Sequence, residues 1–117
     1  MQQRTAGHEL RREVRVGTGA ALVAMYNGND IAVTLRDCSL HGIGVVSPVS
    51  MEAGDYCVIS LVVAVPVGVA YAVRHCRQLS ASEWLIGGQL IGCMTDFSID
   101  AQRIFDVLRS RNAMLQP

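Results

Sequence analysis

An uncharged segment at residues 56–73 constrains the fold more than any other part of this sequence. Valine and other apolar residues dominate it, and its length is close to the roughly 20 residues that span a bilayer as a helix. A proline, a valine and a glycine at residues 66–68 interrupt it near its middle, with β-branched residues on both sides. Such a pattern is typical of two strands joined by a turn. We therefore predict a β-hairpin with strands at residues 56–65 and 69–79, and no insertion of this segment into a membrane.

The other apolar segments before residue 94 also have the composition of short strands separated by turns. An Asn-Gly pair at Asn27 and Gly28 is a strong hairpin signal. The consecutive glycines Gly87 and Gly88 predict a bulge or a close approach of the backbone. Six short strands with turns at intervals of about 8–12 residues are typical of an antiparallel barrel or sandwich. The remaining predicted strands are residues 14–25, 30–36, 43–47 and 83–93.

After the last predicted strand, the apolar residues follow a helical period. Ile104, Phe105 and Leu108 form one apolar stripe. Ser98 is a candidate N-cap, which would place Asp100 in the first turn. We expect this helix to pack across one end of the barrel. The residue pattern therefore predicts an all-β domain, an antiparallel barrel or sandwich of six strands with one C-terminal α-helix.

The length and composition indicate a single domain of restricted function. The chain has 117 residues, which suit one domain with its own core. Its ten basic and ten acidic residues cancel, so it lacks the broad positive field that binding to duplex DNA requires. The four cysteines form no C-x-x-C pair, which argues against a zinc site and for buried thiols in a reducing compartment. Because residues 1–13 are polar and resemble no secretory signal, we predict a flexible arm there and a cytoplasmic domain at residues 14–117.

Basic residues in and beside this arm form the first of two polar motifs. Arg11 and Arg15 are spaced i, i+4, and Arg12 lies between them. A guanidinium is planar, permanently charged and forked, so it can bridge two phosphate oxygens or the O6 and N7 atoms of guanine, or stack on a base. Taken alone, such a pair is common and is equally well explained as the solvated face of a linker.

The second motif, D-C-S-L-H-G at residues 37–42, follows the first predicted hairpin. Asp37 and Ser39 would share one face of an extended segment, where the carboxylate can accept the N1–H and N2–H of guanine beside the hydroxyl. Gly42 would let the backbone turn tightly or approach a ligand closely. Ordinary turn capping also explains Asp37 and Ser39. A catalytic triad with His41 is excluded, because Asp37 and His41 would lie about 13 Å apart along a strand.

In this order and separation, the two motifs resemble those of the PilZ domain family. That resemblance covers essentially the whole chain and implies a six-stranded β-barrel with a C-terminal helix that binds the bacterial second messenger cyclic di-GMP. It implies that the arginines wrap the ligand from the arm while the Asp and Ser contact a guanine from the barrel, with no metal and no catalysis. The residues that the resemblance assigns to the ligand are Arg11, Arg12, Arg15, Asp37, Ser39 and Gly42.

The basic arm and the sequence DCSLHGIGV also resemble the PilZ module of bacterial cellulose synthase catalytic subunits. This narrower resemblance implies a cytoplasmic domain of an inner-membrane, UDP-glucose-dependent glycosyltransferase. In such a protein Arg11 would restrain a gating loop until cyclic di-GMP draws it away. Two alternatives remain open: a motility regulator, and a PilZ-like adaptor that binds proteins without a ligand. The neutral charge and the few aromatic residues disfavour an unrelated barrel that binds single-stranded nucleic acid.

Overall fold

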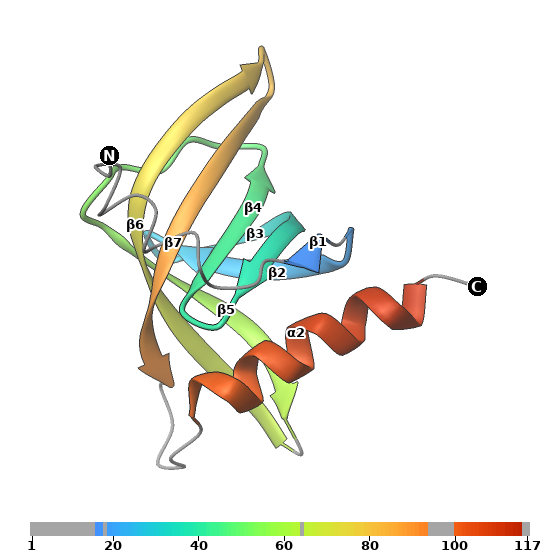
Figure 1. The fold of residues 1–117 in the computed structure, drawn as a ribbon. Helices are drawn as coiled ribbons and strands as arrows, with labels where there is room; N and C mark the ends of the chain where they lie inside the picture. Colours follow the sequence, from blue (N-terminus) through green and yellow to red (C-terminus); the bar gives the residue numbers. More distant parts are fainter. Residues whose placement is uncertain (1–15, 18, 64, 94–99, 116–117) are drawn as a thin grey trace, which may run out of the picture.

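The computed structural model describes residues 16–17, 19–63, 65–93 and 100–115 of the chain. Most of the described residues before residue 94 lie in strands, and a helix follows (Figure 1). The strands are β1 (Val16–Gly17), β2 (Ala21–Tyr26), β3 (Asn29–Ser39), β4 (Gly42–Ser47), β5 (Tyr56–Val63), β6 (Val65–Ser80) and β7 (Glu83–Cys93), and the helix is α2 (Ala101–Leu115).

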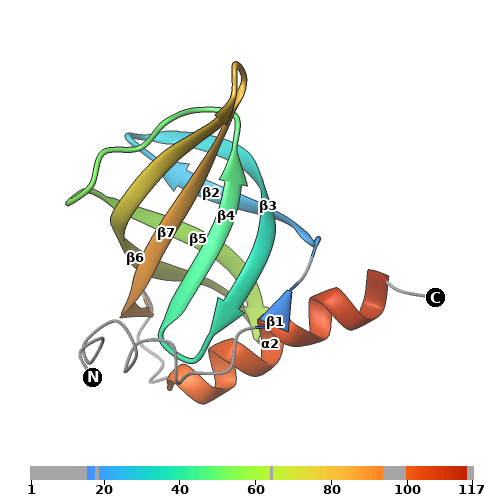
Figure 2. The ribbon, with the colours of Figure 1, turned by 45° about the horizontal axis from the view of Figure 1, so that its top comes forward.

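The strands form one antiparallel sheet that closes on itself. They lie side by side in the order β1-β3-β2-β5-β6-β7-β4, and a further pairing of β3 with β4 closes the ring. The six strands from β2 to β7 therefore make a barrel, which Figure 1 and Figure 2 show from two directions. The short β1 is added beside β3. The predicted fold class, a six-stranded antiparallel β-barrel with a C-terminal α-helix, is confirmed.

The β2–β3 hairpin shows how the sequence sets the register. Asn27 and Gly28 connect the two strands with φ angles of 52° and 79°, the left-handed pair that a type I′ turn requires. Along β2, buried and exposed residues alternate, and Leu22, Ala24 and Tyr26 are the buried ones. Because a slip of one residue would expose these three side chains, the hydrophobic pattern and the turn together fix the register.

The barrel interior is filled mainly by aliphatic side chains. Leu35 on β3, Ile59 on β5 and Ile86 on β7 are at most 1% exposed, and Tyr71 on β6 is the largest side chain among them. Burial of apolar area contributes about 25 cal/mol per Å². We therefore attribute most of the stability of the barrel to this interior rather than to the surface charges.

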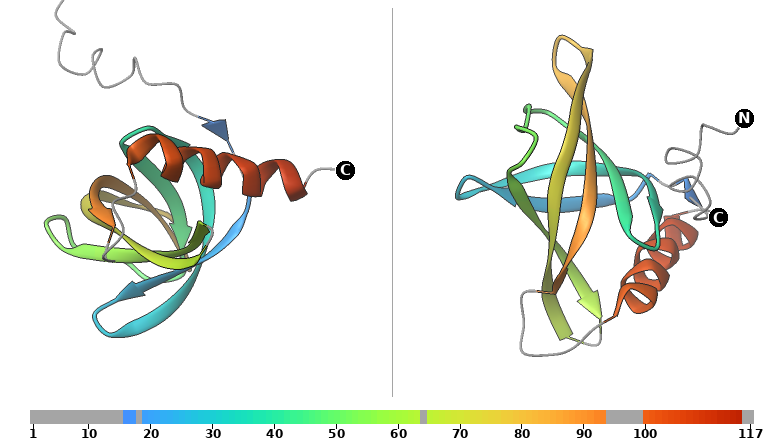
Figure 3. Two further views of the ribbon diagram at one scale, coloured as in Figure 1. Left: turned by 90° about the horizontal axis from the view of Figure 1, so that it is seen from below. Right: turned by 60° about the vertical axis from the view of Figure 1, so that its left-hand side comes forward.

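Helix α2 lies across one end of the barrel (Figure 3) and packs against β3 and β5. Ile104, Phe105 and Leu108 are buried and belong to the same apolar cluster as the barrel interior, which confirms the predicted stripe. Within the described part of the chain, no helix combines the length and the apolar composition needed to cross a membrane.

The N-cap of α2 differs from the prediction. The backbone N–H of Arg103 donates a hydrogen bond to Oδ1 of Asp100 at 2.9 Å. Asp100 is thus the capping residue rather than a residue of the first turn, because its carboxylate satisfies the third N–H of a helix that begins at Ala101. Ser98, the predicted cap, lies outside the described residues.

The segment predicted as a single first strand, residues 14–25, contains two strands in its described part. Both pair with β3, but at different positions, since Val16 lies opposite Cys38 and Ala21 opposite Thr34. The break falls in a glycine-rich stretch, where strand propensity is low. As a result, β1 pairs with the end of β3 that carries the D-x-S motif.

The long hairpin is confirmed, but the prediction placed its turn too late. β5 and β6 remain paired as far as Val63 opposite Val65, so β6 begins before the predicted break and contains Pro66. Pro66 lies opposite Val62, near the end of the hairpin. At that position its missing N–H removes at most one hydrogen bond from the ladder, and a proline is tolerated.

Candidate functional site

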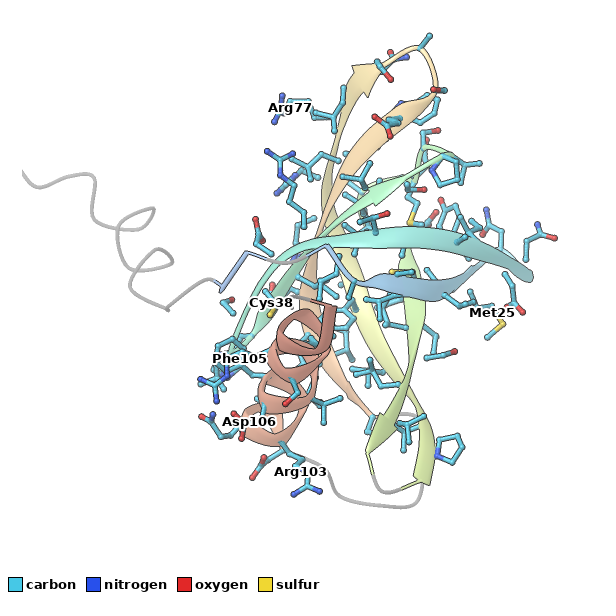
Figure 4. All side chains as sticks on the ribbon, turned by 90° about the vertical axis from the view of Figure 1, so that its right-hand side faces the viewer. Met25, Cys38, Arg77, Arg103, Phe105 and Asp106 are labelled. Atoms are coloured by element: carbon cyan, nitrogen blue, oxygen red, sulfur yellow. The ribbon has the colours of Figure 1, made fainter. Side chains whose placement is uncertain are left out.

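The carboxylate and the hydroxyl of the D-x-S motif share the outer face of β3. Cys38 between them is 0% exposed and belongs to the apolar core, on the side of β3 that faces α2 (Figure 4). Asp37 is half-buried and Ser39 is 4% exposed. A β-bulge between Leu35 and Asp37 shifts the alternation, so that Leu35 lies in the core and Asp37 at the surface. Alternation along a strand then gives Ser39 the same orientation as Asp37.

Two glycines of β4 lie directly opposite these side chains. Ser39 pairs with Gly42, and Asp37 pairs with Gly44. A Cβ atom added at Gly44 would lie 2.8 Å from Oδ1 of Asp37. The carboxylate therefore rests against bare backbone, and at these two positions nothing on β4 stands between the motif and the next strand.

The same row of residues continues in register across β7 to β6. Gly44 pairs with Gly87, and Gly87 pairs with His75. A Cβ atom at Gly87 would overlap the imidazole of His75, so this ring covers the glycine. Asp37, Gly44, Gly87 and His75 thus form one row across the sheet, with a polar side chain at each end and glycine backbone between them.

A second β-bulge brings another polar side chain to this surface. The bulge lies between Val73 and His75 on β6, and Arg74 is the extra residue. Nε of Arg74 donates a hydrogen bond to Oε1 of Gln89 on β7 at 2.7 Å. Gln89 lies opposite Gly42, so this pair stands across the glycine backbone from the D-x-S motif.

These side chains line one hollow on the outside of the barrel, with a volume of about 440 Å³. That volume falls within the range of small-molecule sites, about 300–1,000 Å³. The polar groups around it are hydrogen-bond donors and acceptors that suit a planar polar ligand. Among the described residues, no cluster of His, Cys, Asp or Glu side chains is arranged to hold a metal ion. The residues that line the hollow are Asp37, Ser39, His41, Gly42, Ile43, Gly44, Arg74, His75, Leu85, Ile86, Gly87, Gly88 and Gln89.

The arginine motif cannot be placed in the same way. Three predicted ligand residues lie outside the described part of the chain: Arg11, Arg12 and Arg15. The two residues that follow Arg15 are described, and they pair with the motif strand, Val16 opposite Cys38 and Gly17 opposite Asp37. The chain therefore enters the barrel beside the D-x-S motif, on the edge of β3 that is not occupied by β4.

The residue pattern did not predict the side of the hollow formed by β6 and β7. The signal for Gly87 was present, because the pair of glycines predicted a close approach, and His75 makes that approach. Arg74 and Gln89 carried no comparable signal. They are separated by 15 positions in the sequence and meet at a bulge of β6 that lies opposite Gly87 and Gly88. The glycine pair predicted a bulge or a close approach, but not which residue of the partner strand would be the extra one.

Comparison with known proteins identifies the class. The PilZ domain family matches residues 9–108, which is most of the chain, and this protein therefore belongs to that family of cyclic di-GMP receptor domains. The match includes both polar motifs and the strands that carry the hollow.

One solved structure, the Bacillus subtilis inhibitor of motility MotI/DgrA, resembles this chain with a TM-score of 0.60 at 12% sequence identity. The likeness covers 98% of this chain and 52% of MotI/DgrA, so the chain spans about half the length of that protein. At this level of identity the likeness is evidence for the fold alone. No curated protein sequence matches.

Proposed function

We propose that this domain is a receptor for cyclic di-GMP and regulates an effector protein without catalysing a reaction itself. The observation that carries the proposal is the pairing of β1 with β3. Val16 lies opposite Cys38, and Arg15 precedes Val16 directly in the sequence. Consecutive Cα atoms are about 3.8 Å apart, and we infer from this spacing that the side chain of Arg15 reaches the D-x-S motif on either side of Cys38.

The chemistry of the hollow fits one guanylate half of the ligand. Asp37 would accept the N1–H and N2–H of a guanine, a pair of donors that adenine lacks, and Ser39 would bond beside it. The glycines opposite them let the flat base approach the backbone closely. Arg11, Arg12 and Arg15 would supply the forked cations for the phosphates and for stacking on a base. Each motif thus complements a different part of the same dinucleotide.

We propose that the regulatory signal is a change in the segment that carries these arginines. Binding would fix that segment against the barrel, and part of the interaction free energy would offset the chain entropy lost in doing so. An effector that contacts the same segment, or is covalently continuous with it, would then respond to the ligand. This mechanism requires no change in the barrel itself.

For the effector, we propose the catalytic subunit of a cellulose synthase, which would make this chain a cytoplasmic domain of an inner-membrane protein. The support is the sequence of the arm and of the DCSLHGIGV motif. The alternative is a motility regulator, a role for which the same fold is suited, as the inhibitor of motility MotI/DgrA shows. Co-purification of the intact protein with its membrane or motor partner would distinguish the two.

Isothermal titration of arginine variants with cyclic di-GMP tests the proposed receptor. Loss of one charge-assisted hydrogen bond raises Kd about tenfold or more. Arg11→Ala and Arg15→Ala should therefore each weaken binding by at least that factor. Arg103→Ala is the matched control, because Arg103 is an exposed arginine on α2. Equal affinities for all four proteins would reject the role of the arginine motif. A failure of the wild-type protein to bind, together with a stable protein complex, would instead favour an adaptor.

A further inference from the structure

We propose that Arg74, held in position by Gln89, is a ligand-binding arginine of the same site and contacts the second half of the cyclic dinucleotide. This inference rests on the proposed function. It assigns the β6–β7 side of the hollow, which lies across the glycine backbone from the D-x-S motif, to a particular part of the ligand. Arg74 and Gln89 both line that hollow.

The strand geometry places Arg74 on the ligand side of the barrel. Val73 is 0% exposed and pairs with Gly88, while His75 pairs with Gly87. Two steps along β6, from Val73 to His75, thus lie opposite one step along β7, and Arg74 is the additional residue. Bulges of this kind redirect a side chain, and they are frequent beside binding sites. The other bulge at the hollow, on β3, has the same effect on Asp37.

The hydrogen bond between Arg74 and Gln89 orients the guanidinium and contributes little to the stability of the fold. Arg74 and Gln89 are both exposed, and a hydrogen bond between exposed side chains contributes little to folding. An arginine has five N–H donors in a rigid fork, and the bond from Nε uses one of them. It fixes the plane of the guanidinium while the terminal nitrogens keep the paired geometry that matches two phosphate oxygens or the O6 and N7 atoms of guanine.

The distance across the hollow matches a ligand with two nucleotide units. The strands that carry Asp37 and Arg74 are separated by β4 and β7, which is three inter-strand spacings, or roughly 14 Å along the sheet. Between them, Gly44 and Gly87 carry no side chain, and the carboxylate of Asp37 and the imidazole of His75 lie against their backbone. A guanine held at Asp37 would occupy the β3 side of this span, and the second unit of a cyclic dinucleotide would extend toward Arg74.

Charge supports the same assignment. Among the described residues that line the hollow, Arg74 is the only permanently positive side chain and Asp37 is the only acidic one. A ligand with two phosphates that lay in this hollow would carry negative charge toward β6 and β7. Arg74 offsets that charge on the side of the site that lies farthest from β1.

Calorimetric titration of Arg74 variants with cyclic di-GMP tests the assignment. Arg74→Ala should weaken binding about tenfold or more. Arg74→Lys should recover little of the loss, because an ammonium cannot bridge two acceptors. Arg77→Ala is the matched control, since Arg77 is an exposed arginine on the same strand, labelled in Figure 4, and it does not line the hollow. Arg77→Ala should bind cyclic di-GMP with the affinity of the wild-type protein. All three variants should have the melting temperature of the wild-type protein.

A double-mutant cycle tests the positioning role of Gln89. Gln89→Ala should weaken binding severalfold in the wild-type background and have no further effect when Arg74 is already alanine. Additive losses would overturn that role. Wild-type affinity of Arg74→Ala would overturn the assignment of Arg74 while leaving the proposed receptor intact. A wild-type protein that does not bind cyclic di-GMP at all would overturn both.

Discussion

At Gly44 and Gly87, the lack of a side chain allows a polar neighbour to lie against the backbone. The carboxylate of Asp37 occupies the space that a Cβ of Gly44 would fill, and the imidazole of His75 does the same at Gly87. In both cases the glycine is directly opposite the polar residue in the strand pairing. The polar groups of the hollow are therefore positioned by residues that have no functional group of their own.

Gly44→Ala should reduce ligand affinity more than it reduces stability. The new Cβ would lie 2.8 Å from Oδ1 of Asp37, so the carboxylate must rotate away from the position in which it would accept the guanine donors. Because the obstructing atom is the end of a flexible side chain, we expect a change of less than about 1 kcal/mol in the free energy of unfolding and a severalfold increase in Kd. Titration calorimetry and urea denaturation would measure the two quantities. Gly92→Ala is the control, since a Cβ there meets nothing within 4 Å.

At this scale the sequence predicted one side of the hollow and missed the other. Asp37 and Ser39 could be found because they belong to a short motif and because alternation along a strand gives them one face. Arg74 could not be found, because its orientation depends on a bulge that shifts β6 against β7. Gly87 and Gly88 predicted a bulge or a close approach on β7, but the extra residue of a bulge is set by the pairing of two distant segments, and the partner segment carried no local signal for it.

Among the elements, β1 and α2 are neighbours of β3, the strand that carries the D-x-S motif. β1 pairs with β3 at Cys38 on one edge, and α2 packs against β3 at the end of the barrel. The sequence predicted the helix well, because its apolar stripe is a local periodic signal. It did not predict the separation of β1 from β2. That break depends on how β1 and β2 each pair with β3, whereas a continuous run of β-forming residues predicts a single strand.

Asp100→Ala should destabilise α2 through the loss of its N-cap. The carboxylate of Asp100 accepts the N–H of Arg103 at 2.9 Å, and loss of such a cap typically costs about 1 kcal/mol. The midpoint of urea denaturation should fall accordingly, with an unchanged slope. Ser98→Ala is the informative comparison, because the sequence alone favoured Ser98 as the cap. An equal or larger effect of Ser98→Ala would contradict the capping role of Asp100.

For the whole molecule, a closed barrel hides ionisable groups inside an aliphatic interior. Burial raises the pKa of the Cys57 thiol to about 11 and raises the pKa of Tyr71 as well, with a further contribution from the nearby Cys38 and Cys57. The number and length of the strands predicted a barrel or a sandwich, and the resemblance to the PilZ family predicted the closed barrel that the sheet forms. The prediction that all four cysteines are buried was wrong for two of them, since Cys38 and Cys57 are buried, whereas Cys76 and Cys93 are partly exposed.

The free energy of unfolding should therefore fall at alkaline pH. The raised pKa means that Cys57 keeps its proton in the folded state up to about pH 11, whereas an ordinary thiol has a pKa of 9.0. Above about pH 9 the unfolded chain binds fewer protons than the native one, so stability that is present below that pH is lost as the pH rises. By about pH 10.5, Cys57 alone should account for roughly 2 kcal/mol.

Urea denaturation at about pH 7, 8.5 and 10.5 would measure this loss. Cys57→Ala should lose less stability than the wild-type protein over the same range, and Cys76→Ala, which changes a partly exposed cysteine, should behave like the wild type. Identical pH profiles for Cys57→Ala and the wild-type protein would show that the buried thiol does not cause the effect.

We propose, as the central point, that the hollow between β3 and β6 binds a guanine through the D-x-S motif. The segment that carries the arginines would then contact the phosphates. The most direct measurement is a calorimetric titration of the wild-type protein and of Asp37→Ala with cyclic di-GMP and with cyclic di-AMP. The wild-type protein should bind cyclic di-GMP and prefer it strongly over cyclic di-AMP, and Asp37→Ala should lose most of that preference. A wild-type protein that binds neither dinucleotide, or an Asp37→Ala variant with the full preference for guanine, would contradict the claim.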